Sequence, residues 1–243
     1  MFENCVNLYD VSNLKLLAET LKPSCYYYMF RNCTSLISPP ELPATTLASS
    51  CYEGMFSGCT LLTEAPVLKA ETLATSCYRN MFEGCTSLTE APALKAQALG
   101  HRCYEGMFRG CTSLENAPEL PATTLVSYCY YYMFYGCASL ISVPELKATV
   151  LDEYCCAEMF SGCASLENIP KILLATELRR YCYYGMFRGC TSLTTAPELP
   201  AKTLVENCYQ SMFYKCEKLN YIKIGLTNWN NYECLRWWLS GVA

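Results

Sequence analysis

The residues of this chain that could carry out chemistry are 19 cysteines and one histidine, His101. Most of the cysteines form pairs with the spacing C-x7-C. The first members are Cys25, Cys51, Cys77, Cys103, Cys129, Cys155, Cys182 and Cys208, and the second members are Cys33, Cys59, Cys85, Cys111, Cys137, Cys163, Cys190 and Cys216. Structural zinc sites favour C-x2–4-C spacings or paired cysteines and histidines. We therefore expect neither a metal site nor a cofactor.

The positions of the cysteines favour a packing role over redox chemistry. Cys51 falls four positions from both Leu47 and Met55, which places its thiol on an apolar stripe. A buried cysteine behaves as a small hydrophobic residue with a weak donor. Along a helix the two cysteines of a pair would lie about 12 Å apart, whereas a disulfide needs Cα atoms within about 7 Å. We expect free thiols in the core, and disulfides within or between repeats are the alternative.

Two residues remain as candidates for catalysis. Cys156 replaces the tyrosine of the other repeats, and it is either a reactive thiol or neutral variation, which we favour. His101 lies at a variable position, held elsewhere by Ser49 and Ser127, so we expect it on the surface. A Cys–His nucleophile would need a cysteine beside this histidine, and Cys103 belongs to the apolar stripe. We expect no enzyme, and a thiol-based enzyme is the least favoured reading.

The elements that position these residues repeat along the chain. The first cysteines follow one another at 26 residues, with one step of 27 between Cys155 and Cys182. A period of 20–29 residues is typical of leucine-rich-repeat solenoids. We expect one solenoid domain over residues 1–225, with a bulge near Ile172 at the longer step. Residues 226–243 contain all three tryptophans and are expected to form a Trp-rich cap.

Each repeat predicts a short helix followed by a short strand. Two adjacent stripes with i, i+4 spacing, one of them Leu47, Cys51 and Met55, predict a helix over residues 48–57. Gly58 follows as a C-terminal cap in the left-handed conformation. All nine methionines and all nine phenylalanines occur in Met-Phe pairs. This uniformity predicts a buried row in which each phenylalanine contacts its neighbours.

The strand is expected in the Ser-Leu-x-x-Ala-Pro-x-Leu segment at residues 87–94. Its proline limits its length. Strands stack at about 4.8 Å, whereas helices need about 8–10 Å. A row of helices opposite a row of strands must therefore curve. We expect short parallel strands on the concave face and short helices on the convex face.

The repeat resembles the BspA-like class of leucine-rich repeats, whose units carry an aromatic-x-x-Cys-x-x-Leu core. Here that core reads Phe82-Glu83-Gly84-Cys85-Thr86-Ser87-Leu88. The resemblance covers residues 1 to about 225. It implies a right-handed α/β repeat solenoid and a bacterial surface or secreted protein used in adhesion or partner binding. The Met-Phe pair and the additional Cys-Tyr cysteine depart from the usual pattern of the class.

The first residues also bear on localisation. Met1-Phe2-Glu3-Asn4-Cys5 matches residues 29–33, so the chain begins within a repeat. We expect a longer protein in which any secretion signal or anchor lies upstream. No apolar run approaches the roughly 20 residues that a membrane span needs. With a net charge of −4 and no basic cluster, nucleic-acid binding is not expected.

Candidate binding residues are those that break the repeat. Irregular tyrosines, which offer a large contact area at low entropic cost, are Tyr27, Tyr28, Tyr128, Tyr131, Tyr132, Tyr135, Tyr181 and Tyr184. Acidic residues near the strand are Glu41, Glu64, Glu90, Glu115, Glu119, Glu145, Glu167 and Glu198. The glutamates form either an acidic stripe for a basic partner or a solvated face that keeps the protein soluble.

These patterns predict a protein-binding scaffold at a bacterial surface. A carbohydrate-binding adhesive module that uses tyrosine and glutamate is the alternative. End-to-end self-association of solenoids is a further expected mode of contact.

Overall fold

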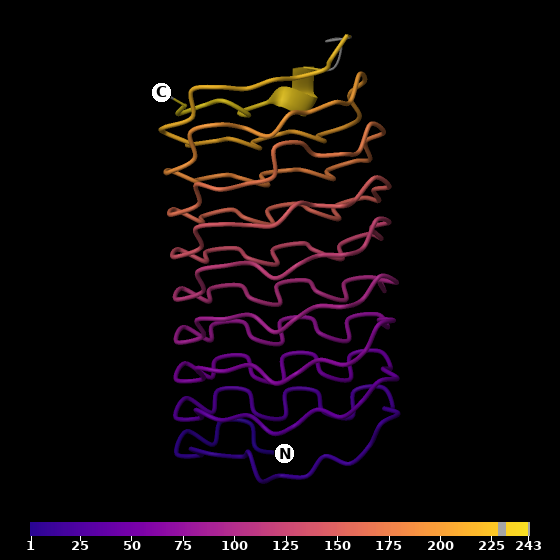
Figure 1. The fold of residues 1–243 in the computed structure, drawn as a ribbon, viewed down its shortest axis with the longest axis vertical. Coiled ribbons are helices and arrows are strands. Elements are labelled where there is room, and N and C mark those ends of the chain that lie inside the picture. Colours follow the sequence, from indigo (N-terminus) through magenta and orange to yellow (C-terminus); the bar gives the residue numbers. More distant parts are fainter. Residues whose placement is uncertain (228–231, 243) are drawn as a thin grey trace.

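The chain winds into a stack of similar coils, one above another along the long axis, with the termini at opposite ends (Figure 1). This computed structural model describes residues 1–227 and 232–242. Each coil has two long sides. We call the side formed by residues 24–32 and their equivalents the turn face. The side formed by residues 37–46 and their equivalents is the bridge face.

The turn face is a ladder of consecutive β-turns. Within a coil, alternate backbone N–H groups donate to the carbonyl three residues earlier, as Met29 N does to Tyr26 O at 3.2 Å. The N–H groups between them donate to the next coil, as Phe30 N does to Met55 O at 2.9 Å. Both sets of donors are thereby satisfied, which buried backbone requires. The squared path of each coil in Figure 1 is this series of turns.

The predicted helix over residues 48–57 is wrong, because these residues form turns. Ser50, Gly54 and Gly58 have φ values of 52°, 59° and 74°. A left-handed residue at every fourth position interrupts an α-helix. The sequence period is four residues, which fits a repeated turn better than the 3.6 residues of a helix. In the described part of the chain, the only helix is the 3-10 helix η1, Tyr232–Leu235.

The predicted strands are reduced to isolated parallel bridges, such as those joining Asn116 to Ser142 and Ser142 to Asn168. A proline two residues after each of these positions has no N–H to extend the ladder. The expected curvature depended on helices being spaced more widely than strands, and in the described residues the turn face has no such helices. Because the turn layers bond directly from coil to coil, the turn face needs no wider spacing than the bridge face.

The predicted phenylalanine row is confirmed. Successive rings lie nearly parallel with centroids 5.4–5.8 Å apart. From Phe30 to Phe213 every ring of the row is fully buried. The stack continues across the longer step, since Phe160 and Phe187 are 5.7 Å apart. There Leu173 and Ala175 take the buried places that Leu146 and Ala148 hold in the preceding coil.

The C-terminal segment extends the turn ladder. Phe213 N donates to Trp238 O at 3.0 Å and Lys215 N to Ser240 O at 2.8 Å, as between earlier coils. Buried Cys234 lies 26 residues after Cys208 and continues its row. Residues 228–231 and 243 of the expected Trp-rich cap lie outside the described residues.

Candidate functional site

The structure brings the predicted residues Tyr128, Tyr131, Tyr132 and Tyr135 together on the turn face. Ring centroids are 5.5 Å apart for Tyr128 and Tyr131, 4.0 Å for Tyr131 and Tyr132, and 5.2 Å for Tyr132 and Tyr135. Three tyrosines of the next two coils join them. We call the whole group the tyrosine cluster: Tyr128, Tyr131, Tyr132, Tyr135, Tyr154, Tyr181 and Tyr184.

The centre of the tyrosine cluster is a stack of three rings from successive coils. Tyr128 and Tyr154 lie 4.8 Å apart with planes 6° from parallel, and Tyr154 and Tyr181 lie 4.5 Å apart at 7°. The guanidinium of Arg102 lies 4.4 Å from the centre of the Tyr128 ring. The faces of the Tyr128 and Tyr154 rings are thus used within the stack, which leaves their edges and hydroxyl groups for other contacts.

Four tyrosines of the cluster occupy positions of unfavourable backbone conformation. Tyr128, Tyr132, Tyr154 and Tyr181 have φ values of 58°, 55°, 55° and 54°. Several equivalent positions of other repeats hold small residues, such as Ser50, Gly54 and Asn80, although Tyr28 and Arg102 are also large. A bulky side chain in the left-handed region costs free energy and commonly marks a functional position. The scaffold alone therefore does not account for these side chains.

Sequence reasoning missed Tyr154. The signal was present, because Tyr154 follows Tyr128 by 26 residues and precedes Tyr181 by the 27 of the longer step. These three residues share one position of the repeat and must stack once the coils are in register.

Tyr27 and Tyr28 are not part of this cluster, because they lie four coils earlier. Their rings are 4.2 Å apart, and the guanidinium of Arg31 lies 4.6 Å from the centre of the Tyr28 ring. The ring of Tyr28 also covers Gly54, where a Cβ atom would lie too close to it.

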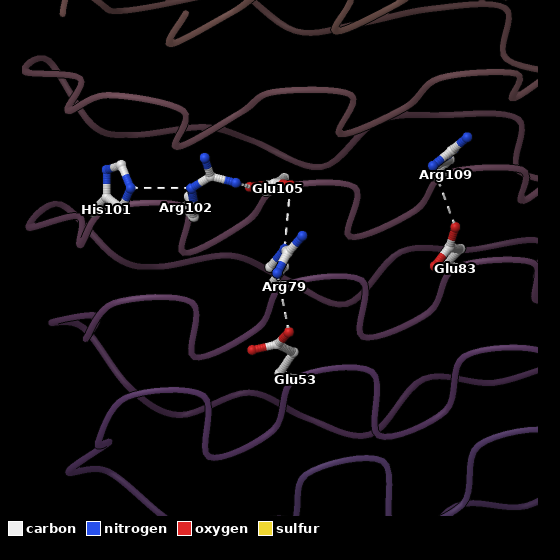
Figure 2. Close-up of polar contacts among 7 residues, drawn as sticks. All are labelled: Glu53, Arg79, Glu83, His101, Arg102, Glu105 and Arg109. Atoms are coloured by element: carbon white, nitrogen blue, oxygen red, sulfur yellow. Dashed lines mark hydrogen bonds and ion pairs between the residues drawn. The ribbon is translucent and has the colours of Figure 1, made fainter. Parts of the chain in front are cut away.

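An ion-pair network links several coils of the turn face (Figure 2). Arg79 lies between two buried carboxylates, 3.3 Å from Glu53 Oε1 and 3.2 Å from Glu105 Oε1. Arg102 Nη1 lies 3.0 Å from Glu105 Oε2, and its Nε donates to His101 Nε2 at 3.1 Å. His101 is exposed, as predicted. Arg102 therefore links the network to Tyr128.

Glu158 is a buried carboxylate beside the tyrosine cluster. Its side chain is 7% exposed, and Oε1 lies 3.7 Å from Arg188 Nη1. Burial raises the pKa of Glu158, while a hydrogen bond with Ser161 and the charge of Arg188 oppose the shift. The ionised form is thus held less favourably in the folded protein than in the unfolded chain.

We expect the change Glu158→Gln to raise the free energy of unfolding at pH 7. The pKa of Glu158 is raised on folding, so protonated Glu158 favours the folded state. This contribution to the free energy of unfolding is fully present below the ordinary pKa and is lost as the pH rises through the raised pKa. The difference in free energy of unfolding between Glu158→Gln and the native chain should therefore disappear near pH 4. Urea unfolding at pH 4 and pH 7 measures this, and a variant less stable than the native chain at pH 7 would contradict it.

The predicted glutamates lie on the bridge face. Glu41, Glu64, Glu90, Glu115, Glu119, Glu145 and Glu167 are exposed, and Glu198 is half-buried. Lysines lie among them: Lys147 Nζ is 3.9 Å from Glu119 Oε2, and Lys223 Nζ is 2.9 Å from Glu198 Oε1. The face therefore carries both signs of charge.

Two shallow grooves on the bridge face are lined in part by these glutamates. Glu41, Glu64 and Lys69 line one of about 530 Å³, together with prolines of two coils. Glu167 and Glu198 line another of about 480 Å³. The glutamates near the two ends of the bridge face thus line concave surfaces that carry both signs of charge.

All nineteen cysteines are free thiols, and only Cys5 and Cys25 are exposed. The second thiol of a pair donates to a phenylalanine carbonyl of the preceding coil, as Cys85 Sγ does to Phe56 O at 3.2 Å. Burial raises the pKa of Cys59 to about 12. Thiols held neutral in this way are poor nucleophiles and poor metal ligands.

Cys156 is not accessible for reaction. The residue is 1% exposed. A hydrogen bond with Cys155 and then burial raise its pKa well above the ordinary value. Among residues 1–227 and 232–242, no group of His, Cys, Asp and Glu is arranged to hold a metal ion. In the same residues, no helix has both the length and the apolar composition to cross a membrane.

Comparisons with known proteins place the repeat in a family. The family described as BspA type leucine rich repeat region matches residues 1–106 and 101–185, in six copies. Among curated proteins, none matches the chain.

Two crystal structures show limited similarity. A leucine-rich repeat protein of Bacteroides ovatus is 17% identical with a TM-score of 0.43, over 91% of this chain and 62% of that one. A leucine rich cell surface protein of Faecalibacterium prausnitzii is 18% identical with a TM-score of 0.38, over 94% and 76%. The chain thus spans less than two thirds of the first relative. With its repeats matched over residues 1–185, the chain belongs to the family of BspA-type leucine-rich repeat proteins.

Proposed function

We propose that this chain is a non-enzymatic binding module of a bacterial surface or secreted protein, and that the tyrosine cluster contacts another protein. The observation that carries the proposal is the gathering of seven tyrosines, four of them at left-handed positions. Because a solenoid of this kind presents a long repetitive surface, specificity must come from the positions that differ between repeats.

The geometry of the rings favours a protein over a carbohydrate as the partner. A sugar packs on an open aromatic face. The faces of Tyr154 are covered by Tyr128 at 4.8 Å and Tyr181 at 4.5 Å. Edges and hydroxyl groups remain, and these suit the mixed polar and apolar contacts of protein interfaces.

We also propose a second contact surface on the bridge face. It consists of Glu64, Glu90, Glu115, Glu119, Glu145 and Glu167, all of them exposed. The groove beside Glu41 and Glu64 offers concave surface for a basic segment of a partner. Binding at this surface should weaken as salt is added, unlike contacts of the tyrosine cluster.

The test compares two tyrosine variants on arrays of extracellular proteins and of glycans. Tyr131→Ser combined with Tyr132→Ser should weaken protein binding by roughly tenfold or more. Tyr27→Ser is the matched control, because Tyr27 holds the same position of the repeat as Tyr131, four coils earlier. It should leave binding unchanged.

Measurements of stability and of self-association are needed to interpret the binding results. All of these tyrosines are partly exposed, so the free energy of unfolding should change by less than about 1 kcal/mol. Light scattering shows whether the bound partner is a second copy of the chain. Unchanged binding by the double variant, or hits on glycans alone, would refute the tyrosine cluster as a protein contact.

A further inference from the structure

A separate hollow of about 230 Å³ lies on the turn face, lined by Arg188, Ser211, Tyr214 and Trp237. It does not include the tyrosine cluster. Of the lining residues, Ser211 is only 8% exposed.

Trp237 supplies an aromatic wall from an unfavourable backbone position. Its φ is 58°, and it holds the position of the repeat that is Gly185 and Ser211 in the two preceding coils. The guanidinium of Arg236 lies 5.8 Å from the centre of its ring, and the residue remains 55% exposed. A bulky aromatic residue at a left-handed position, with much of its surface open, is not explained by packing alone.

Arg188 supplies a cation in a fixed orientation. Its guanidinium lies 5.2 Å from the centre of the Tyr214 ring, which holds the plane in place. Its carboxylate partner is Glu158 at 3.7 Å, a long contact that leaves N–H groups unused. The side chain of Arg188 is 46% exposed, and the lining within the described residues contains no carboxylate.

We propose that this hollow binds a small planar aromatic carboxylate. The carboxylate accepts hydrogen bonds from the guanidinium of Arg188, whose planar fork matches its geometry. The ring of the ligand packs against the indole of Trp237, and Ser211 lines the hollow beside it. A neutral ring would lose the contact with Arg188, and an aliphatic acid would lose the contact with Trp237.

Benzoate and indole-3-carboxylate are suitable probes, with benzamide as the uncharged analogue. Titration is followed by NMR through the indole N–H signal of Trp237, assigned from Trp237→Ser, and by calorimetry. The native chain should bind both acids saturably and shift that signal. Benzamide should bind roughly tenfold more weakly, since it lacks the charge-assisted hydrogen bonds.

Two variants and a control locate the site. Arg188→Gln should weaken binding of benzoate roughly tenfold, and Trp237→Ser should abolish it. Arg109→Gln is the matched control, because Arg109 also lies over tyrosines of the turn face, 5.5 Å from Tyr132 and 5.4 Å from Tyr135, outside the hollow. It should bind benzoate as the native chain does.

Three results would each overturn the assignment. These are no saturable binding of either acid by the native chain, equal binding of benzamide, and an equal loss in Arg109→Gln. Arg188→Gln removes the cation beside buried Glu158 and should lose some stability, so its circular dichroism spectrum checks that it is folded under the conditions of the titration.

Discussion

Replacement of Phe108 by alanine should lower the free energy of unfolding by about 3–5 kcal/mol. Phe108 is fully buried between Phe82 at 5.6 Å and Phe134 at 5.4 Å. The change removes a ring from the middle of a continuous stack, so two coils lose contacts. Because neighbouring coils are packed and hydrogen-bonded to each other, the cavity cannot close by a local shift alone.

Urea unfolding followed by circular dichroism measures this effect. Tyr135→Ala is the control, since it removes an aromatic ring from the next coil at a residue that is 37% exposed. It should cost less than about 1 kcal/mol. A near-neutral Phe108→Ala variant would show that the phenylalanine row is not the core of the solenoid.

Replacement of Arg79 by methionine should cost about 2–3 kcal/mol at pH 7. Breaking a buried ion pair by removing one partner typically costs 3–5 kcal/mol, and the 34% exposure of the Arg79 side chain reduces this. The side chains of Glu53 and Glu105 are only 8% and 9% exposed. Without Arg79, Glu53 has no cation within 4 Å among the described residues, whereas Glu105 keeps Arg102.

Two further variants show whether the loss in Arg79→Met comes from the stranded carboxylates. Arg109→Met is the control, because Arg109 pairs with the more exposed Glu83 at 3.6 Å (Figure 2). It should cost less than about 1 kcal/mol. Adding Glu53→Gln and Glu105→Gln to Arg79→Met should recover much of the loss by removing the stranded charges. Equal losses for Arg79→Met and Arg109→Met would contradict the importance of carboxylate burial.

The core residues could be read from the sequence, but their backbone conformation could not. Leu47, Cys51 and Met55 fall four positions apart, a spacing that a helix and a series of four-residue turns share. The distinguishing feature was residue type at every fourth position, where Ser50, Gly54 and Gly58 occur. These residues tolerate left-handed φ values, but only Gly58 was expected to have one.

The hydrogen bonds explain why the local pattern misled. In an α-helix every acceptor lies four residues away. Here half of the N–H groups on the turn face find acceptors about 25 residues away, as Tyr28 N does at Glu53 O. A pattern of neighbouring residues contains no information on a partner in the next coil, so the turn ladder emerges only when coils are stacked.

In the candidate site, too, some features followed from the sequence and others only from the stacking of coils. Tyr128, Tyr131, Tyr132 and Tyr135 lie close in the chain, and their clustering followed from the sequence. Tyr154 joins them only because the coils stack in register, with its ring 4.8 Å from Tyr128. The network of Arg79 with Glu53 and Glu105 likewise joins three successive coils.

The sequence by itself determined the repeat, its family, the rows of buried phenylalanine and cysteine, and the absence of cysteine pairs spaced for zinc. These follow from residue type and period, because identical residues one period apart must occupy equivalent places. The tertiary structure decided the turn conformation, the extent of the tyrosine cluster and the hollow at Trp237. Each depends on which side chains of neighbouring coils meet, and that is set by coil-to-coil hydrogen bonds between residues distant in the chain.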